Sequence, residues 1–162
     1  IIYRELYQKG LLGTELASLI TNMELGDPFS VQGVLDTACW SRTGTTGPTI
    51  GETLQRAGHK LRRADKNRIQ GKIQIHEYLK VMQSGRPKIQ ILNTCPNLIR
   101  ELQSIPLDKR NPEDVDTHAP DHAYDALRYL IMSRPRINDT LNQMRQFHRE
   151  RIYSPMDSTF GY

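Results

Sequence analysis

The chain has 162 residues, which suits a single domain, because one hydrophobic core commonly serves about 100 to 200 residues. Hydrophobic residues make up 37% of the sequence and charged residues 25%, a balance that excludes a disordered chain and favours a globular one. The net charge of +4 permits a polyanionic partner such as nucleic acid without requiring one.

The sequence shows neither a membrane span nor a secretory signal. No stretch approaches the roughly 18 consecutive apolar residues of a transmembrane helix. The first ten residues, IIYRELYQKG, lack the charged start and the apolar run of a secretory signal. Cys39 and Cys95 stand outside any CxxC spacing, so we expect two reduced thiols. These features predict an intracellular protein with no membrane partner.

Strands and helices alternate in the predicted first part of the chain. Residues 1–10 are rich in β-formers on alternating faces, which predicts a strand that starts at the first residue. We therefore expect the first strand or strands of the domain to lie upstream of this sequence. Residues 14–25 place apolar side chains at helical spacing, with Thr14 as a possible cap. Residues 31–35 predict a buried strand that ends at Asp36 in a polar loop.

The rest of the chain continues this alternation. The further predicted elements are a helix over 49–57, a strand over 59–65, a helix over 67–82, a strand over 88–93, a helix that begins near Pro96 and a helix over 121–132. Gly71 weakens the helix that contains it. We therefore expect an α/β domain with a mixed or parallel sheet over residues 1–135. Residues 136–162 are expected to form a polar C-terminal tail, with one short helix over 139–151.

Acidic residues in two of these elements are candidates for chemistry. In open α/β sheets ligands collect at the carboxyl ends of the strands, where Asp36 is expected. The alternative for Asp36 is a cap or a tight turn. In the helix 121–132, Asp121, His122 and Asp125 share one side through i, i+3 and i, i+4 spacing. They avoid the predicted apolar stripe of Ala123, Ala126, Leu127, Leu130 and Ile131, so the alternative is a solvated face with acids near the helix N-terminus.

These acids suggest a metal site if they meet in the fold. Asp36 and Asp125 would repel each other at close range, and a divalent cation is the usual remedy. Oxygen ligands without cysteine favour Mg²⁺ or Mn²⁺ over zinc. Two such cations about 4 Å apart can activate water and stabilise the leaving oxygen in phosphodiester hydrolysis. A metal-dependent nuclease is therefore one hypothesis.

A series of motifs points to a known family. In chain order they are YRELY at 3–7, Asp36 at a strand end, IGETL at 50–54, AG at 57–58, ADKNRIQG at 64–71 and DHAYDALRY at 121–129. Their order and spacing resemble the nuclease domain of phage terminase large subunits over residues 1 to about 135. DHAYDALRY is the most specific of these motifs.

The resemblance implies a ribonuclease H-like fold, in which a mixed sheet is flanked by helices and three acids gather around two Mg²⁺ or Mn²⁺ ions. By matching position, Asp36 and Asp125 are two of these acids, and His122 is an auxiliary ligand or proton-transfer group. Asp121 is a further metal candidate, and the first acid is expected upstream of this sequence. The positions that resemble the DNA path, where cations hold phosphates without reading sequence, are Arg63, Lys66 and Arg68. The alternative for these three is an ordinary basic surface.

The resemblance also implies an endonuclease domain that cuts concatemeric double-stranded DNA during viral packaging. The implied partners are double-stranded DNA, the portal protein, the small terminase subunit and an ATPase domain upstream in the same polypeptide. The phosphate-binding pattern GxxxxGK[ST] of such an ATPase does not occur in this sequence. The implied location is the host cytoplasm and, transiently, the procapsid portal. Two alternatives are a non-catalytic DNA- or portal-docking module and another ribonuclease H-like nuclease, such as a resolvase or transposase relative.

Overall fold

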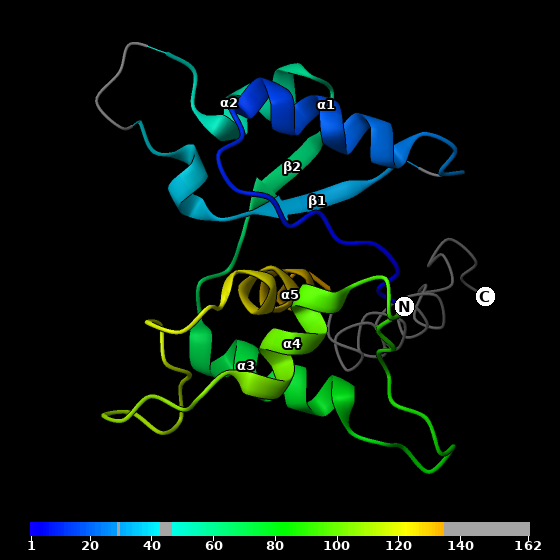
Figure 1. The fold of residues 1–162 in the computed structure, drawn as a ribbon, viewed down its shortest axis with the longest axis vertical. Helices are drawn as coiled ribbons and strands as arrows, with labels where there is room; N and C mark the ends of the chain where they lie inside the picture. Colours follow the sequence, from blue (N-terminus) through cyan, green and yellow to red (C-terminus); the bar gives the residue numbers. More distant parts are fainter. Residues whose placement is uncertain (29, 43–46, 135–162) are drawn as a thin grey trace, which may run out of the picture.

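The computed structural model describes residues 1–28, 30–42 and 47–134, which form a mixed α/β arrangement with one small sheet (Figure 1). The predicted tail at 136–162 and its helix at 139–151 lie outside these residues. Among the described helices, none is both long and apolar enough to cross a membrane. The elements are α1 (Gly13–Glu24), β1 (Gln32–Leu35), the 3₁₀ helix η1 (Thr37–Trp40), α2 (Ile50–Arg56), β2 (Lys60–Arg63), α3 (Arg68–Leu79), α4 (Pro96–Ser104) and α5 (His122–Met132).

The sheet separates two groups of helices. β1 and β2 pair in parallel, from Gln32 opposite Lys60 to Leu35 opposite Arg63, and η1 and α2 lie in the connection between them. Such a crossover is what a parallel pair requires. Figure 1 shows α1 and α2 on one side of this sheet and α3, α4 and α5 on the other. The helix α5, which carries the DHAYDALRY motif, contacts β1, and its Tyr129 binds Asp36 at the carboxyl end of that strand.

The five α-helices predicted within the described residues are confirmed, with shifts at their ends. The start of α2 follows from a reciprocal cap, in which Thr49 Oγ1 accepts the Glu52 N–H at 3.1 Å and the Glu52 carboxylate accepts the Thr49 N–H at 2.9 Å. The prediction of Thr14 as the cap of the first helix was wrong. That helix begins after Leu12, whose N–H donates to the Glu15 carboxylate at 2.8 Å.

Two predicted strands, at 1–10 and 88–93, do not form. The two segments meet only at a parallel bridge between Ile2 and Ile91, with two backbone hydrogen bonds of 2.7 and 2.9 Å at Ile2. Beyond this bridge the Glu5 carboxylate turns to α4 and accepts backbone N–H groups of its first turn at 2.9 and 3.0 Å. This contact leads the chain away from a strand ladder, so the sheet is smaller than predicted.

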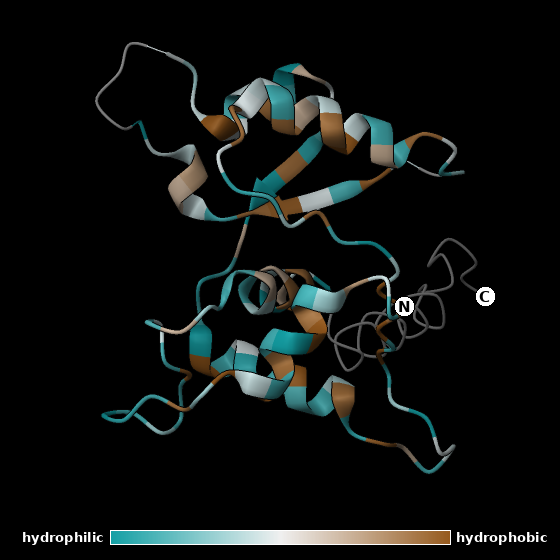
Figure 2. Cartoon of the chain, in the orientation of Figure 1, coloured by the Kyte–Doolittle hydropathy of each residue, from teal (hydrophilic) through white to brown (hydrophobic). Residues whose placement is uncertain are grey.

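The main core lies among α3, α4, α5 and the segments that join them. Hydrophobic and hydrophilic positions alternate along these helices, as expected where each helix buries one face (Figure 2). Cys95 is fully buried and Cys39 partly buried, and both are free thiols as predicted. The buried cluster consists of Ile75, Ile89, Cys95, Leu98, Val115, Tyr124, Leu127 and Ile131.

Candidate functional site

Asp36 lies directly after β1, at the carboxyl end of the sheet, where the sequence predicted it. Its Oδ1 accepts the N–H of Ala38 at 2.7 Å, so Asp36 also caps η1. Tyr129 of α5 donates its hydroxyl to Asp36 Oδ2 at 2.5 Å, and Lys66 Nζ lies 3.5 Å from Oδ1. The prediction that the preceding strand is buried was wrong, because the two-stranded sheet leaves β1 half-exposed.

These contacts decide the charge of Asp36. Burial raises the pKa of its carboxyl, but the hydrogen bonds from Tyr129 and Ala38 and the charge of Lys66 outweigh burial and hold the pKa below its ordinary value. Burial and the hydrogen bond to Asp36 raise the pKa of the Tyr129 phenol well above its usual range. Asp36 is therefore an ionised acceptor at neutral pH, and Tyr129 is the donor.

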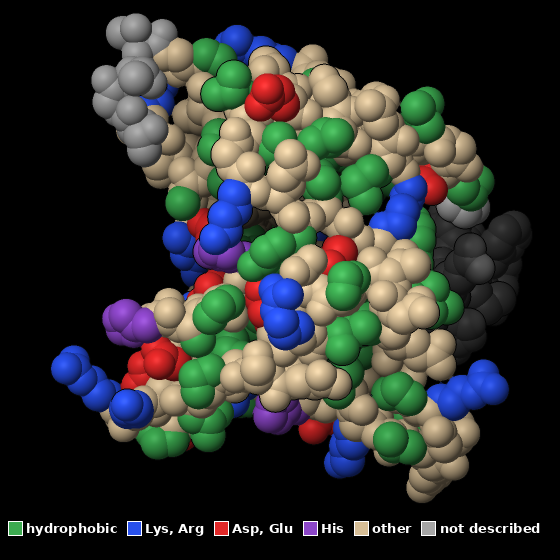
Figure 3. All heavy atoms as spheres, viewed as in Figure 1, with side chains coloured by type: hydrophobic (Ala, Val, Ile, Leu, Met, Phe, Trp, Pro, Cys, Tyr) green, Lys and Arg blue, Asp and Glu red, His purple; other side chains and the backbone are tan. Residues whose placement is uncertain are grey.

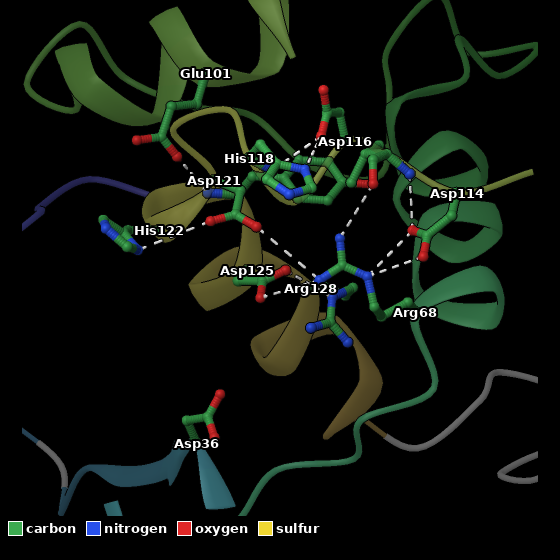
Figure 4. A network of polar contacts seen from close by, with 12 residues as sticks. Asp36, Arg68, Glu101, Asp114, Asp116, His118, Asp121, His122, Asp125 and Arg128 are labelled. Atoms are coloured by element: carbon green, nitrogen blue, oxygen red, sulfur yellow. Dashed lines mark hydrogen bonds and ion pairs between the residues drawn. The ribbon is translucent and has the colours of Figure 1, made fainter. Parts of the chain in front are cut away.

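A second group of acids surrounds Arg68 at the start of α3 (Figure 4). Arg68 Nη1 lies 4.0 Å from Asp121 Oδ2 and 3.7 Å from Asp125 Oδ2. Its Nε donates to both oxygens of Asp114, at 3.0 and 3.2 Å. Sequence reasoning missed Asp114, because the polar segment that contains it shows no periodicity to place its side chains. The structure thus brings Asp121 and Asp125 together around a cation from another helix.

Asp125 has a second cationic partner, Arg128, one turn farther along α5. Arg128 Nε donates to Asp125 Oδ1 at 3.0 Å, and its guanidinium lies 4.4 Å from the centre of the Tyr129 ring. Arg128 is only 2% exposed, and its Nη1 is buried without a hydrogen-bond partner among the described residues. Sequence reasoning missed this residue, since a buried arginine within an amphipathic helix has no pattern of its own.

The crowding of carboxylates changes the acidity of Asp121. Burial and the nearby charge of Asp125 raise the pKa of Asp121, and the charges of Arg68 and His122 only partly oppose them. The side chain of Asp121 is 15% exposed, so water screens this repulsion weakly. A further cation would relieve it.

His122 lies away from this group. Its side chain is 73% exposed, its Nδ1 is 3.8 Å from Asp121 Oδ1, and its ring centre is 6.5 Å from that of Tyr7. Figure 4 shows His122 on the far side of Asp121 from Asp125. The i, i+3 spacing therefore does not bring His122 and Asp125 to one point, and a catalytic role for His122 stays a prediction.

Asp36 and the acids of α5 lie on the same side of the molecule. Figure 4 shows Asp36 at the end of β1, below the part of α5 that carries Asp125 and Arg128. The link is Tyr129, which follows Asp125 by one helical turn and binds Asp36. Within the described residues, no three His, Cys, Asp or Glu side chains are arranged to hold a metal ion. The expected meeting of Asp36 and Asp125 at one metal site is thus not seen among the described residues, where Tyr129 links Asp36 to the helix that carries Asp125.

The predicted DNA-binding residues differ in their surroundings. Lys66 is 57% exposed beside Asp36, and the guanidinium of Arg63 lies 5.2 Å from the centre of the Trp40 ring. Arg68, in contrast, is 25% exposed and paired with carboxylates. Figure 3 shows basic and acidic side chains side by side at the hollow between the two halves of the molecule. Lys66 and Arg63 are thus more exposed than Arg68, which lies among three carboxylates.

Comparisons with known proteins add no relative: no family model matches the chain, and neither the curated proteins nor the solved structures hold a significant match.

Proposed function

We propose that this chain is the nuclease domain of a viral DNA-packaging terminase large subunit and that it has a ribonuclease H-like fold. Its activity would be a metal-dependent endonuclease cut in concatemeric double-stranded DNA. One observation carries the proposal: the 2.5 Å hydrogen bond from Tyr129 to Asp36 joins the end of β1 to the helix that bears Asp121 and Asp125. The acids that the motifs single out thereby share one face of the fold.

The candidate ligands are of the chemical type that Mg²⁺ or Mn²⁺ prefers, although the described residues do not gather three of them around one point. The candidate ligands Asp36, Asp121 and Asp125 offer only carboxylate oxygens, which suit hard cations. Burial and the charge of Asp125 raise the pKa of Asp121, and a bound cation would offset the repulsion between the two carboxylates. When bound, two such cations would activate a water molecule and stabilise the leaving oxygen of the phosphodiester. The chain's own part is to hold them through these carboxylates and to orient Asp36 through Tyr129.

Basic residues next to these acids would hold the DNA. The ammonium group of Lys66 is exposed beside Asp36, and β2 ends with two exposed arginines, Arg62 and Arg63. Cations at these positions contact phosphates and carry no base preference, which agrees with cleavage that is largely independent of sequence. The other proposed partners are the portal protein, the small terminase subunit and an upstream ATPase domain. The proposed location is the host cytoplasm.

The proposal is tested by removing one candidate ligand at a time. Asp125→Asn and Asp36→Asn keep the shape of each side chain and remove its charge, so each should weaken Mn²⁺ binding in calorimetry by about tenfold or more, since 1.4 kcal/mol is a factor of ten. Asp116→Asn is the control, because among the described residues the Asp116 side chain hydrogen-bonds only to His118. Circular dichroism would show that all three variants fold.

Cleavage supplies the second readout. Mn²⁺-dependent nicking of supercoiled plasmid by the full-length polypeptide should disappear in Asp125→Asn and Asp36→Asn and persist in Asp116→Asn. Nicking by a folded Asp125→Asn variant at the wild-type rate would remove Asp125 from the mechanism.

One observation favours a second candidate, a non-catalytic module that grips DNA. Asp36 is paired with Lys66, and Asp125 with Arg68 and Arg128, so the site is already neutralised by the chain's own cations. Metal titration separates the two readings. A folded protein that binds duplex DNA but shows no saturable Mn²⁺ binding would support the gripping module and refute the nuclease.

A further inference from the structure

We propose that Arg68 is a built-in counter-ion for Asp121 and Asp125, and that a DNA phosphate draws it away so that DNA and metal bind cooperatively. This inference rests on the proposed nuclease function and adds a regulation of the same site. Until DNA arrives, the positive charge of Arg68 keeps the two carboxylates from a divalent cation.

Arg68 is held in this position by a part of the chain outside the proposed metal site. Asp114 accepts two hydrogen bonds from Arg68 Nε, at 3.0 and 3.2 Å, and the Val115 carbonyl accepts one from Nη2 at 3.4 Å. These contacts fix one edge of the guanidinium and leave Nη1 directed at Asp121 and Asp125 (Figure 4). Asp114 is therefore a positioning residue.

Of the two arginines at Asp125, Arg68 is the more accessible. Arg128 is 2% exposed and packs along Gly71, where an added Cβ would lie 2.4 Å from Arg128 Cγ. Arg68 is 25% exposed and lies 3.7 Å from Asp125 Oδ2, longer than the 3.0 Å contact between Arg128 Nε and Asp125 Oδ1. An incoming cation would therefore compete with Arg68 for Oδ2, while Arg128 keeps Oδ1.

Charge explains why the two cations exclude each other. A divalent ion bound to Asp121 and Asp125 would lie within a few ångströms of the guanidinium, where like charges repel strongly in a partly buried site. A phosphate offers the guanidinium an alternative partner, because its oxygens match two parallel N–H donors as a carboxylate does. The exposed ammonium of Lys66 lies 3.5 Å from Asp36 Oδ1, two residues before Arg68 in the chain, and would guide a phosphate towards Arg68.

Linkage makes the effect reciprocal. If a phosphate that takes Arg68 strengthens the binding of metal, then metal must strengthen the binding of DNA by the same factor. Couplings of this kind are commonly about 5-fold to 150-fold. The proposal therefore predicts weak Mn²⁺ binding by the free chain and tighter binding in the presence of DNA.

The test measures Mn²⁺ affinity by calorimetry, with and without a short phosphorothioate DNA duplex that resists cleavage. Arg68→Met removes the charge and keeps an unbranched apolar stem, so Mn²⁺ affinity without DNA should rise by about tenfold, within the usual range of such couplings. Lys72→Met is the matched control. Lys72 lies one turn farther along α3 and reaches the same loop through the carbonyls of Pro112 and Asp114, at 3.0 and 3.4 Å.

The outcomes separate this inference from the function on which it rests. Tighter Mn²⁺ binding in Arg68→Met alone, and enhancement by DNA in wild type and in Lys72→Met but not in Arg68→Met, would support it. Equal Mn²⁺ affinity in wild type and Arg68→Met would overturn the inference and leave the nuclease proposal standing. Absence of saturable binding in all three proteins, with or without DNA, would overturn both.

Discussion

Gly71 provides a sharp test of how α3 and α5 pack. A Cβ at this position would lie 2.4 Å from Cγ and 2.6 Å from Cδ of Arg128, closer than nonbonded atoms can approach. Gly71→Ala should improve the intrinsic stability of α3 by about 1 kcal/mol, because alanine is the better helix former. Against this, overpacking costs about 1–3 kcal/mol, and displacing a buried arginine from its carboxylate adds to the cost.

The unfavourable effects should prevail. Arg128 is 2% exposed and the contacts involve the middle of its side chain, so it cannot swing into solvent. We expect Gly71→Ala to lower the free energy of unfolding by about 1–3 kcal/mol in urea denaturation. The control is Gly13→Ala at the start of α1, where the nearest atom to an added Cβ is Thr53 Cγ2 at 3.4 Å and stability should change little. A Gly71→Ala variant as stable as wild type would refute the close packing of α3 on Arg128.

Two further predictions concern hydrogen bonds to carboxylates. Tyr129→Phe should raise the pKa of Asp36 towards its ordinary value and lower the free energy of unfolding by about 1–2 kcal/mol, because a charged acceptor loses its donor. NMR titration of the carboxyl carbon, with Tyr3→Phe as the control, checks this, and an unchanged Asp36 pKa would count against it. Glu5→Gln should destabilise the protein by about 1 kcal/mol at neutral pH, after allowing for solvent screening at the α4 N-terminus. Burial raises the pKa of Glu5, but the hydrogen bonds from Asn97 and Leu98 lower it by a larger amount. The pKa of Glu5 therefore lies below its ordinary value of 4.5. Its contribution is therefore present above that value and lost as pH falls through the lowered pKa, so urea midpoints of variant and wild type should converge in acid. A difference that persists there would contradict this account.

Local sequence predicted the helices well, because their signals lie within a few residues. The Thr49–Glu52 cap and Pro96 in the first turn of α4 act over one helical turn, and apolar spacing extends each helix from there. Strands were predicted less well. Residues 1–10 have the composition of a strand, but a strand also needs a partner along its length, and that partner is set by distant parts of the chain.

The burial pattern of α5 shows the same limit. The predicted stripe included Leu127 and Ile131, which are buried, but also Ala126, which is exposed. Arg128 and Tyr129, outside the stripe, are buried, because α3 covers the first and the second reaches Asp36 at β1. A helix packed on two sides has no single apolar face, so periodicity alone could not identify the second side.

The candidate site divides in the same way. Asp36, Asp121 and Asp125 were found from the sequence, since a strand end and a helical repeat are local features. Their partners depended on tertiary structure: only the packing of α3 and the 107–116 segment against α5 brings Arg68 and Asp114 to these acids. Local spacing determined which acids share a helix, whereas contacts between residues far apart in the chain decided which charges they meet and how strongly they hold their protons.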